Sequence, residues 1–238
     1  MLRTSAVAGL SLALAFTSAV LADHHLDGES ESGAVISLFD GTSLDAWKGY
    51  KTPGPPKGWV IEDGVLVHRS GGVDLVTKET FSDFELAFEW KIAAGGNSGV
   101  IYRCDETEDA PYMTGPEFQV LDNESWGIDP FDPHAAGSLY GLFSVSEKVV
   151  KPAGEWNTAK IVVHDGVVEH WVNGKQVVKA EIGGDKWNEL VSSTKFNAWK
   201  RFGKLSEGHI SLQAHNGQDG DVEPVWFRDI TIRRLGDK

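Results

Sequence analysis

The sequence is poor in cysteine, since its 238 residues include only Cys104. A single cysteine excludes an intrachain disulfide and the cysteine clusters that hold structural zinc. The fold must therefore be held by a hydrophobic core, for which nine Trp and 11 Phe supply bulky side chains. The length suits one domain with such a core, and we interpret Cys104 as a small buried apolar residue.

Basic residues are also scarce: 22 Lys and Arg stand against 35 Asp and Glu, a net charge of −13. Such a chain is a poor partner for nucleic acid and for anionic membrane surfaces. Several catalytic motifs are missing too, because the sequence contains no GxSxG, no HExxH, no P-loop and no GxGxxG after a strand. The sequence therefore lacks the signatures of serine hydrolases, zinc proteases and nucleotide-binding proteins.

Long apolar runs are absent except at the start of the chain, where AVAGLSLALAFTSAVL follows Arg3. This run is short for a membrane span of about 20 residues, and Val20-Leu21-Ala22 suits a cleavage site. We predict a signal peptide over residues 1–22, cleaved after Ala22, and hence a secreted or periplasmic protein without a membrane span in its mature form. Residues 23–35 are polar and are predicted to be a flexible acidic linker.

From residue 36 to residue 235 the sequence consists of short alternating runs, such as GWVIEDGVLVHR and DFELAFEWKI. Asp-Gly and Asn-Gly dipeptides between them suit tight hairpin turns, and no long stretch has a helical period. The pattern predicts a single all-β domain over residues 36–235, built as a sandwich or barrel. Segments 123–157 and 183–206 are predicted to be long loops, the usual location of functional residues.

Four predicted strands carry polar side chains where a fully buried strand would not, and side chains alternate along a strand. The shared faces hold Asn97, Gly99, Ile101 and Arg103; Glu117 and Gln119; His209, Ser211, Gln213 and His215; and Glu169, Trp171 and Asn173. A face in water would explain them, but Gly99 inside a strand often marks close approach by a ligand or backbone. Side chains of this kind suit hydrogen bonding to sugar hydroxyls, so we predict a carbohydrate site.

Two of these residues have plain structural alternatives. Arg103 could pair with Glu117 or Asp105 in a salt bridge, and His170, on a neighbouring hairpin, is interpreted as a hydrogen-bonded sheet histidine. The carboxylates argue against an ordinary glycosidase, which needs two carboxyl groups about 5–5.5 Å or about 6.5–9.5 Å apart. Two residues after Glu117 stands Gln119, so a partner would have to come from Glu169, or from Asp122 after a bulge.

The order of the motifs resembles the 3-keto-disaccharide hydrolase domain family over about residues 36–235. The matching segments are LFDGTSLDAWKGY, GWVIEDGVLV, DFELAFEWKI with GNSGVIYR, EFQVLD, AAGSLYGL, GEWNTAKIVVHDGVVEHWVNGKQV and GHISLQAHNG with VWFRDITIRRL. The resemblance implies a concanavalin A-like jelly-roll β-sandwich of two antiparallel sheets, with the sugar site on the concave face. It also implies cleavage of glycosides already oxidised to a ketone at C3.

The chemistry that the resemblance implies needs one general base and one electrophilic stabiliser. The base removes the C2 proton, the C1 leaving group departs by elimination, and water adds back. By analogy we expect Glu117 or His215 as the base, and Arg103 or a bound divalent cation as the stabiliser. The expected substrate-binding residues are Asn97, Gln119, His134, Tyr140, Gln213 and Trp171. The competing hypotheses are a non-catalytic, lectin-like carbohydrate-binding module and an ordinary glucanase.

Overall fold

The computed structural model describes residue 1, residues 32–215 and residues 222–236. The predicted signal peptide beyond Met1 lies outside the described residues, as does the predicted linker up to residue 31. The prediction that the linker continues to Val35 is wrong, because strand β1 (Ser32–Phe39) already begins at Ser32. Ser32 and Val35 pair with the last strand of the chain, and backbone hydrogen bonds of this kind do not require apolar side chains.

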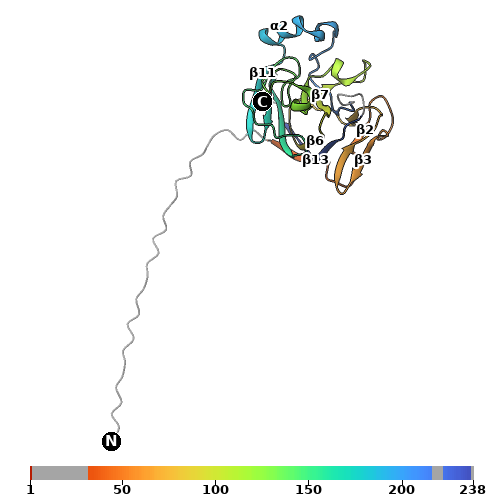
Figure 1. Ribbon diagram of the computed structural model, residues 1–238, viewed down its shortest axis with the longest axis vertical. Helices are drawn as coiled ribbons and strands as arrows, with labels where there is room; N and C mark the ends of the chain where they lie inside the picture. Colours follow the sequence, from red (N-terminus) through yellow and green to blue (C-terminus); the bar gives the residue numbers. More distant parts are fainter. Residues whose placement is uncertain (2–31, 216–221, 237–238) are drawn as a thin grey trace.

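Two antiparallel sheets form a sandwich (Figure 1). The larger sheet has the order β11 (Lys175–Glu181), β10 (Val167–Val172), β9 (Asn157–His164), β6 (Phe84–Ile92), β13 (Val225–Leu235), β4 (Val65–His68) and β3 (Trp59–Glu62), and β1 also pairs with β13. The smaller sheet has the order β2 (Trp47–Gly49), β5 (Leu75–Thr77), β12 (His209–Leu212), β7 (Asn97–Cys104) and β8 (Glu117–Leu121). The predicted all-β sandwich is confirmed.

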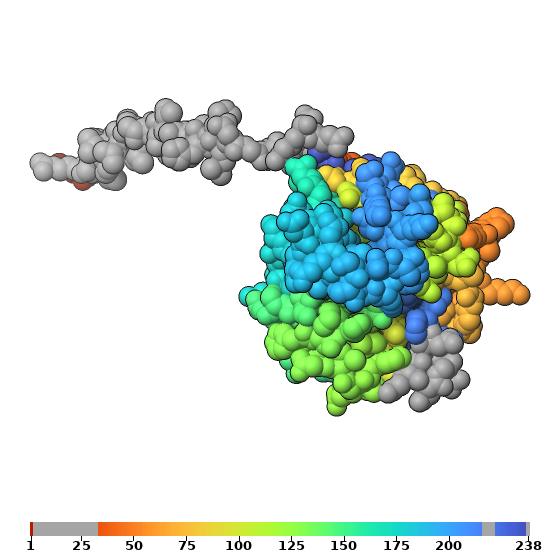
Figure 2. Space-filling view, turned by 90° about the horizontal axis from the view of Figure 1, so that it is seen from above, coloured from red at the N-terminus to blue at the C-terminus, as the bar shows by residue number. Residues whose placement is uncertain are grey.

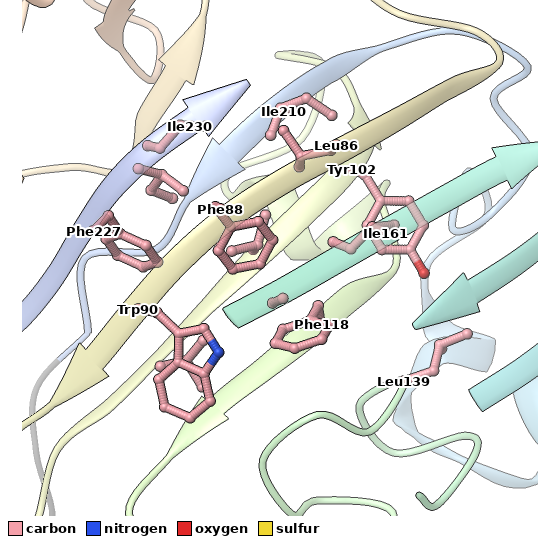
Figure 3. Packing of buried hydrophobic residues seen from close by; sticks show 14 of the residues in the cluster. Leu86, Phe88, Trp90, Tyr102, Phe118, Leu139, Ile161, Ile210, Phe227 and Ile230 are labelled. Atoms are coloured by element: carbon pink, nitrogen blue, oxygen red, sulfur yellow. The ribbon is translucent and has the colours of Figure 1, made fainter. Parts of the chain in front are cut away.

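The core lies between the two sheets and follows the alternation of the sequence. In β6, FELAFEWKI, every second side chain is buried, from Phe84 to Ile92. Figure 3 shows Phe88 and Trp90 of this strand facing Phe118 of the smaller sheet, and the Phe88 and Phe118 rings meet edge to face at 5.6 Å between centroids. Each such ring removed from water contributes about 1.5–3 kcal/mol to stability, which compensates for the missing disulfides.

Four short helices occur between the described strands, and all but η1 lie in the segments predicted as long loops. They are the 3-10 helices η1 (Pro111–Met113) and η2 (Lys195–Ala198) and the α-helices α1 (Asn123–Trp126) and α2 (Asp185–Ser193). Trp187 is the one buried residue of α2, and Leu190 and Val191 on the same side pack against the core; with nine residues, this helix is shorter than the window over which a helical period is recognised. No helix in the described part of the chain is long and apolar enough to cross a membrane.

Candidate functional site

A pocket of about 560 Å³ lies on the outer face of the smaller sheet. Val100, Tyr102 and Phe118 of β7 and β8 belong to the core, so the alternate side chains of these strands point outward. The pocket is lined by six of the nine residues predicted for the site: Asn97, Glu117, Gln119, Tyr140, Gln213 and His215. Residues from the polar faces of three predicted strands thus meet in one cavity, whereas Arg103, His209 and Ser211 of those faces are not part of its lining.

The pairing of the strands brings these residues together. β7 and β8 pair with Gly99 opposite Gln119 and Ile101 opposite Glu117. The Gln213 backbone N–H donates to the Gly99 carbonyl at 2.9 Å, which places the chain after β12 beside the same position. The segment after the long loop adds Tyr140, whose N–H donates to the Glu117 carbonyl oxygen at 3.0 Å.

Glu117 lies across the backbone of Gly99. A Cβ atom on residue 99 would overlap the carboxylate oxygen Oε1 of Glu117, so glycine is required for this placement. With its amide nitrogen turned toward Glu117, Gln119 donates to Oε1 at 3.1 Å and to the Ser98 carbonyl at 3.1 Å. The close approach expected at Gly99 therefore exists, but the approaching group is the Glu117 side chain.

Burial sets the acidity of this carboxyl group. Glu117 is 7% exposed, and loss of hydration raises its pKa to about 8, with Lys195 partly offsetting the rise and Asp74 adding to it. Asp74 precedes β5 and accepts the Ala214 N–H at 2.9 Å; its pKa is raised to about 7, chiefly by burial. A carboxyl group that titrates near neutral pH is suited to taking and returning protons.

Lys195 supplies a positive charge at the pocket and was missed by the sequence reasoning. Its Nζ donates to the Tyr140 hydroxyl at 3.3 Å and lies 4.5 Å from the centre of that ring. It stands at the start of η2, inside the segment 183–206 that was expected to carry function. The sequence indicated the segment, but nothing in the local pattern indicated which of its lysines reaches the smaller sheet.

An aromatic wall, defined here as Tyr112, Phe196, Trp199 and Phe202, forms part of the pocket lining. The Phe196 and Phe202 rings stack at 4.2 Å between centroids, and the Tyr112 and Trp199 rings lie 5.4 Å apart. Figure 2 shows the blue segment 183–206 at the surface beside the yellow-green segment that contains η1, and the Gly203 N–H binds the Thr114 carbonyl at 2.9 Å. None of these four residues was predicted for the site.

The prediction that Arg103 belongs to this site is wrong. Its φ angle is 49°, and the pairing of β7 with β12 shifts register between His209 and Ser211, so strict alternation ends before residue 103. Arg103 instead donates to the Asp83 carboxylate at 2.7 Å and to the Ser82 carbonyl at 2.8 Å. The alternative pairing with Glu117 or Asp105 is wrong as well, although the structural salt bridge itself is real.

Trp171 and His134 are likewise absent from the pocket lining. Trp171 lies on β10 of the larger sheet, where its Nε1 donates to Glu169 at 3.0 Å and Lys160 lies over its ring. His134 Nδ1 lies 2.7 Å from Asp132 Oδ1. The centroids of the His134 and Tyr140 rings are 5.0 Å apart, so His134 contacts a pocket residue without lining the pocket itself. Face alternation does not tell which sheet a strand joins, which is why Trp171 was misplaced.

The interpretation of His170 as a sheet histidine is confirmed. It is fully buried, and its ring nitrogens lie 3.1 Å from the Tyr102 hydroxyl and 3.1 Å from the Gly137 carbonyl oxygen. Burial lowers the pKa of this imidazole to about 4, so it stays neutral at ordinary pH. Cys104 is buried as expected.

The pocket contains one carboxylate among its described lining residues, Glu117. Within the described part of the chain, one group of three acidic and histidine side chains brings its ligand atoms within 4.8 Å: Asp83, His164 and Asp165. That group surrounds the salt bridge of Arg103 and not the pocket. A divalent cation at the pocket stays a prediction, for which Glu117 and the neighbouring amide oxygens would be the ligands.

Comparisons with known proteins bear on the family and the fold of the chain. The model of the 3-keto-alpha-glucoside-1,2-lyase-like domain matches residues 34–233. A relative from Bacteroides thetaiotaomicron is named 3-keto-disaccharide hydrolase. It is 33% identical over an alignment of 237 residues, and the match covers 86% of this chain and 80% of that protein. A Parabacteroides distasonis protein, whose crystal structure was solved as that of a proposed glycosyl hydrolase, superimposes with a TM-score of 0.76 and 31% identity, covering 86% of this chain and 94% of that one.

A more distant likeness concerns the fold alone. A prokaryotic β-1,3-1,4-glucanase (lichenase) derived from a mouse hindgut metagenome superimposes with a TM-score of 0.50 and 12% identity, over 86% of this chain and 100% of that one. The sheets described above thus form the concanavalin A-like jelly roll that the family resemblance implied.

Proposed function

The chain belongs to the family of 3-keto-alpha-glucoside-1,2-lyase-like domains, and from this membership we propose that it cleaves glycosides oxidised to a ketone at C3, with Glu117 as the general base. One observation carries the proposal: a single buried carboxyl group with a pKa of about 8 lies in a pocket that also holds Lys195. An ordinary glycosidase would need two carboxyl groups, whereas elimination next to a ketone needs one base.

The proposed reaction begins at C2, whose proton is acidified by the ketone. Glu117 takes this proton, and the electron pair of the C–H bond forms an enolate whose negative oxygen is stabilised by Lys195 and the Tyr140 hydroxyl. The enolate then collapses, the C1–O bond breaks with its electron pair on the leaving group, and Glu117 returns a proton to that oxygen. Water adds at C1 and a proton returns to C2, which completes hydrolysis.

The second candidate is a lectin-like module, favoured by the amide-rich floor of Asn97, Gln119 and Gln213. These amides suit sugar hydroxyls without any catalysis. A binding module, however, gives no reason to bury a carboxyl group and to open Gly99 for it, since hydration of an exposed carboxylate would cost less free energy. We therefore rank the enzyme first.

The deciding experiment compares aglycone release from a 3-keto-glycoside and from the same glycoside without the ketone. The proposal expects release from the 3-keto compound alone. Equal rates for both would indicate an ordinary glucanase, and binding without release from either would indicate a lectin. Repeating the assay after chelator treatment tests the predicted divalent cation, whose removal lowers the rate only if a metal takes part.

Export of the protein is part of the same proposal. The support is the apolar run from Ala6 to Leu21 after Arg3, followed by the small residue Ala22 at the expected cleavage site. N-terminal sequencing of the protein from the periplasm or the medium is expected to give Asp23 as the first residue. A mature protein that retains residues 1–22 in the cell would contradict export.

A further inference from the structure

The pocket is chemically divided along β8. Tyr112 of η1 and Gly115 precede Glu117, the first residue of β8, and Gln119 follows Glu117 within the strand. Asn97 pairs opposite Leu121, so it lies at the Gln119 end. Glu117 therefore stands at the boundary between a polar end and an aromatic end of the same cavity.

The aromatic end is built as a firm surface. Phe196 and Phe202 are each 3% exposed, and Trp187 of α2 stacks behind Phe202 at 6.1 Å. In front of these buried rings stand Trp199, which is half-buried, and Tyr112, which is 37% exposed. The buried rings thus hold Trp199 and Tyr112 in place while leaving ring surface open to a ligand.

The two ends suit different parts of one substrate. A sugar ring carries hydroxyls around its edge, and the polar end offers amide donors and acceptors from Asn97, Gln119 and Gln213. The aromatic end offers ring faces, which favour stacking with another flat apolar ring. The scissile bond must lie next to Glu117, so the oxidised sugar occupies the polar end and the leaving group extends toward Trp199 and Tyr112.

We propose that the leaving group of the natural substrate is an aromatic ring, and that Trp199 and Tyr112 select it by stacking. The proposal rests on the proposed function for the assignment of sugar and leaving group. A second sugar as leaving group would fit the cavity volume of about 560 Å³ and would place its C–H face on these rings, but the hydroxyls around its edge would find few side-chain partners at this end, where the described lining is mostly aromatic. The substrate class is therefore an aryl 3-keto-glycoside, such as the oxidised form of a phenolic glucoside.

Binding of unoxidised glucosides tests the inference without requiring turnover. The dissociation constants of phenyl glucoside, methyl glucoside and a glucose disaccharide, in both anomers, are measured by calorimetry with the unmodified protein. Phenyl glucoside is expected to bind about tenfold more tightly than methyl glucoside, as one ring-stacking contact provides. In Trp199→Ala and in Tyr112→Ala this preference is expected to fall toward one, whereas Trp199→Phe and the outer-face control Trp171→Ala retain it.

The outcomes separate the two proposals. A disaccharide that binds more tightly than phenyl glucoside, or an aryl preference that survives Trp199→Ala and Tyr112→Ala, would overturn the aromatic leaving-group site. Because Tyr112 is partly exposed, its variant should fold even if Trp199→Ala does not. Aryl preference without release from any 3-keto-glycoside would support the binding site while contradicting the proposed catalysis.

Discussion

The Glu117 carboxyl lies in a space that Gly99 leaves open, and its pKa is raised to about 8 because burial disfavours the charged form. A base with this pKa is stronger than an exposed glutamate, but it is fully available only above its own pKa. Lys195 lowers the same pKa, and its Nζ donates to the Tyr140 hydroxyl at the pocket. In the proposed reaction, these two side chains therefore set both the rate and its pH dependence.

We expect kcat/KM for a 3-keto-glycoside to fall about tenfold per pH unit below about pH 8 and to level above it, because a base must be deprotonated to act. Glu117→Gln is expected to lose about 10²–10⁴-fold in kcat while keeping sugar affinity. Steady-state rates across pH measure both effects, with the exposed Glu155→Gln as control. A rate that instead falls as pH rises through 8 would assign Glu117 the role of acid.

Lys195→Met should lower kcat by about 10²–10³-fold, the cost of removing one stabiliser of a developing oxyanion. It should also move the midpoint of the pH profile upward, since Lys195 lowers the pKa of Glu117. The matched control is Lys186→Met on the exposed face of α2. An unchanged midpoint together with an unchanged kcat would exclude Lys195 from the reaction.

Strand β7 contributes to the site mainly through an absent side chain. Its core-facing residues were predictable, but Gly99 opens the outer face at the position where Glu117 crosses from β8. The segment 183–206 contributes in the opposite way, because four of its side chains line the pocket over that face, where burial raises the Glu117 pKa. The site is thus formed by one strand that lacks a side chain at residue 99 and one segment that adds side chains above it.

Gly99→Ala is expected to leave the fold intact, because the atoms it displaces are the flexible end of Glu117 and not backbone. The carboxylate must then rotate away, so kcat should drop by about 10²-fold, the usual effect of misplacing a reacting group by about 1 Å. Gly184→Ala is the control, since its Cβ would also meet only a flexible glutamate side chain, that of Glu181, outside the pocket. Circular dichroism melting and kcat are measured for both; full activity in Gly99→Ala would refute the placement.

At the scale of the whole molecule, a salt bridge joins the two sheets in addition to the aromatic core. Arg103 of the smaller sheet binds Asp83, the residue directly before β6 of the larger one. Asp83 also accepts a hydrogen bond from the Asp165 N–H at 2.9 Å and lies 3.0 Å from His164 Nδ1. One carboxylate thus joins both sheets and the β9–β10 turn, a stabilising role instead of the catalytic one predicted for Arg103.

Arg103→Met is expected to destabilise the protein by about 3–5 kcal/mol, because it leaves a mostly buried Asp83 without its charge partner. kcat should be unchanged at temperatures where the variant is folded. Arg69→Met, which breaks an exposed pair with Glu62, is the control and should alter the melting temperature little. Chemical denaturation measures the difference, and a strong loss of kcat in folded Arg103→Met would restore its proposed place in the site.

Local sequence determined the strands, the faces of Glu117, Gln119 and Asn97, and the all-β class, because alternation is a property of neighbouring residues. It also determined that no second carboxylate follows Glu117 on its face. The tertiary structure alone decided which faces meet: Lys195 joins Tyr140 from 55 residues away, and the bulge at Arg103 turns that side chain to the other sheet. A register shift and a contact between distant segments both depend on long-range pairing, and such pairing produces no periodic pattern in the local sequence.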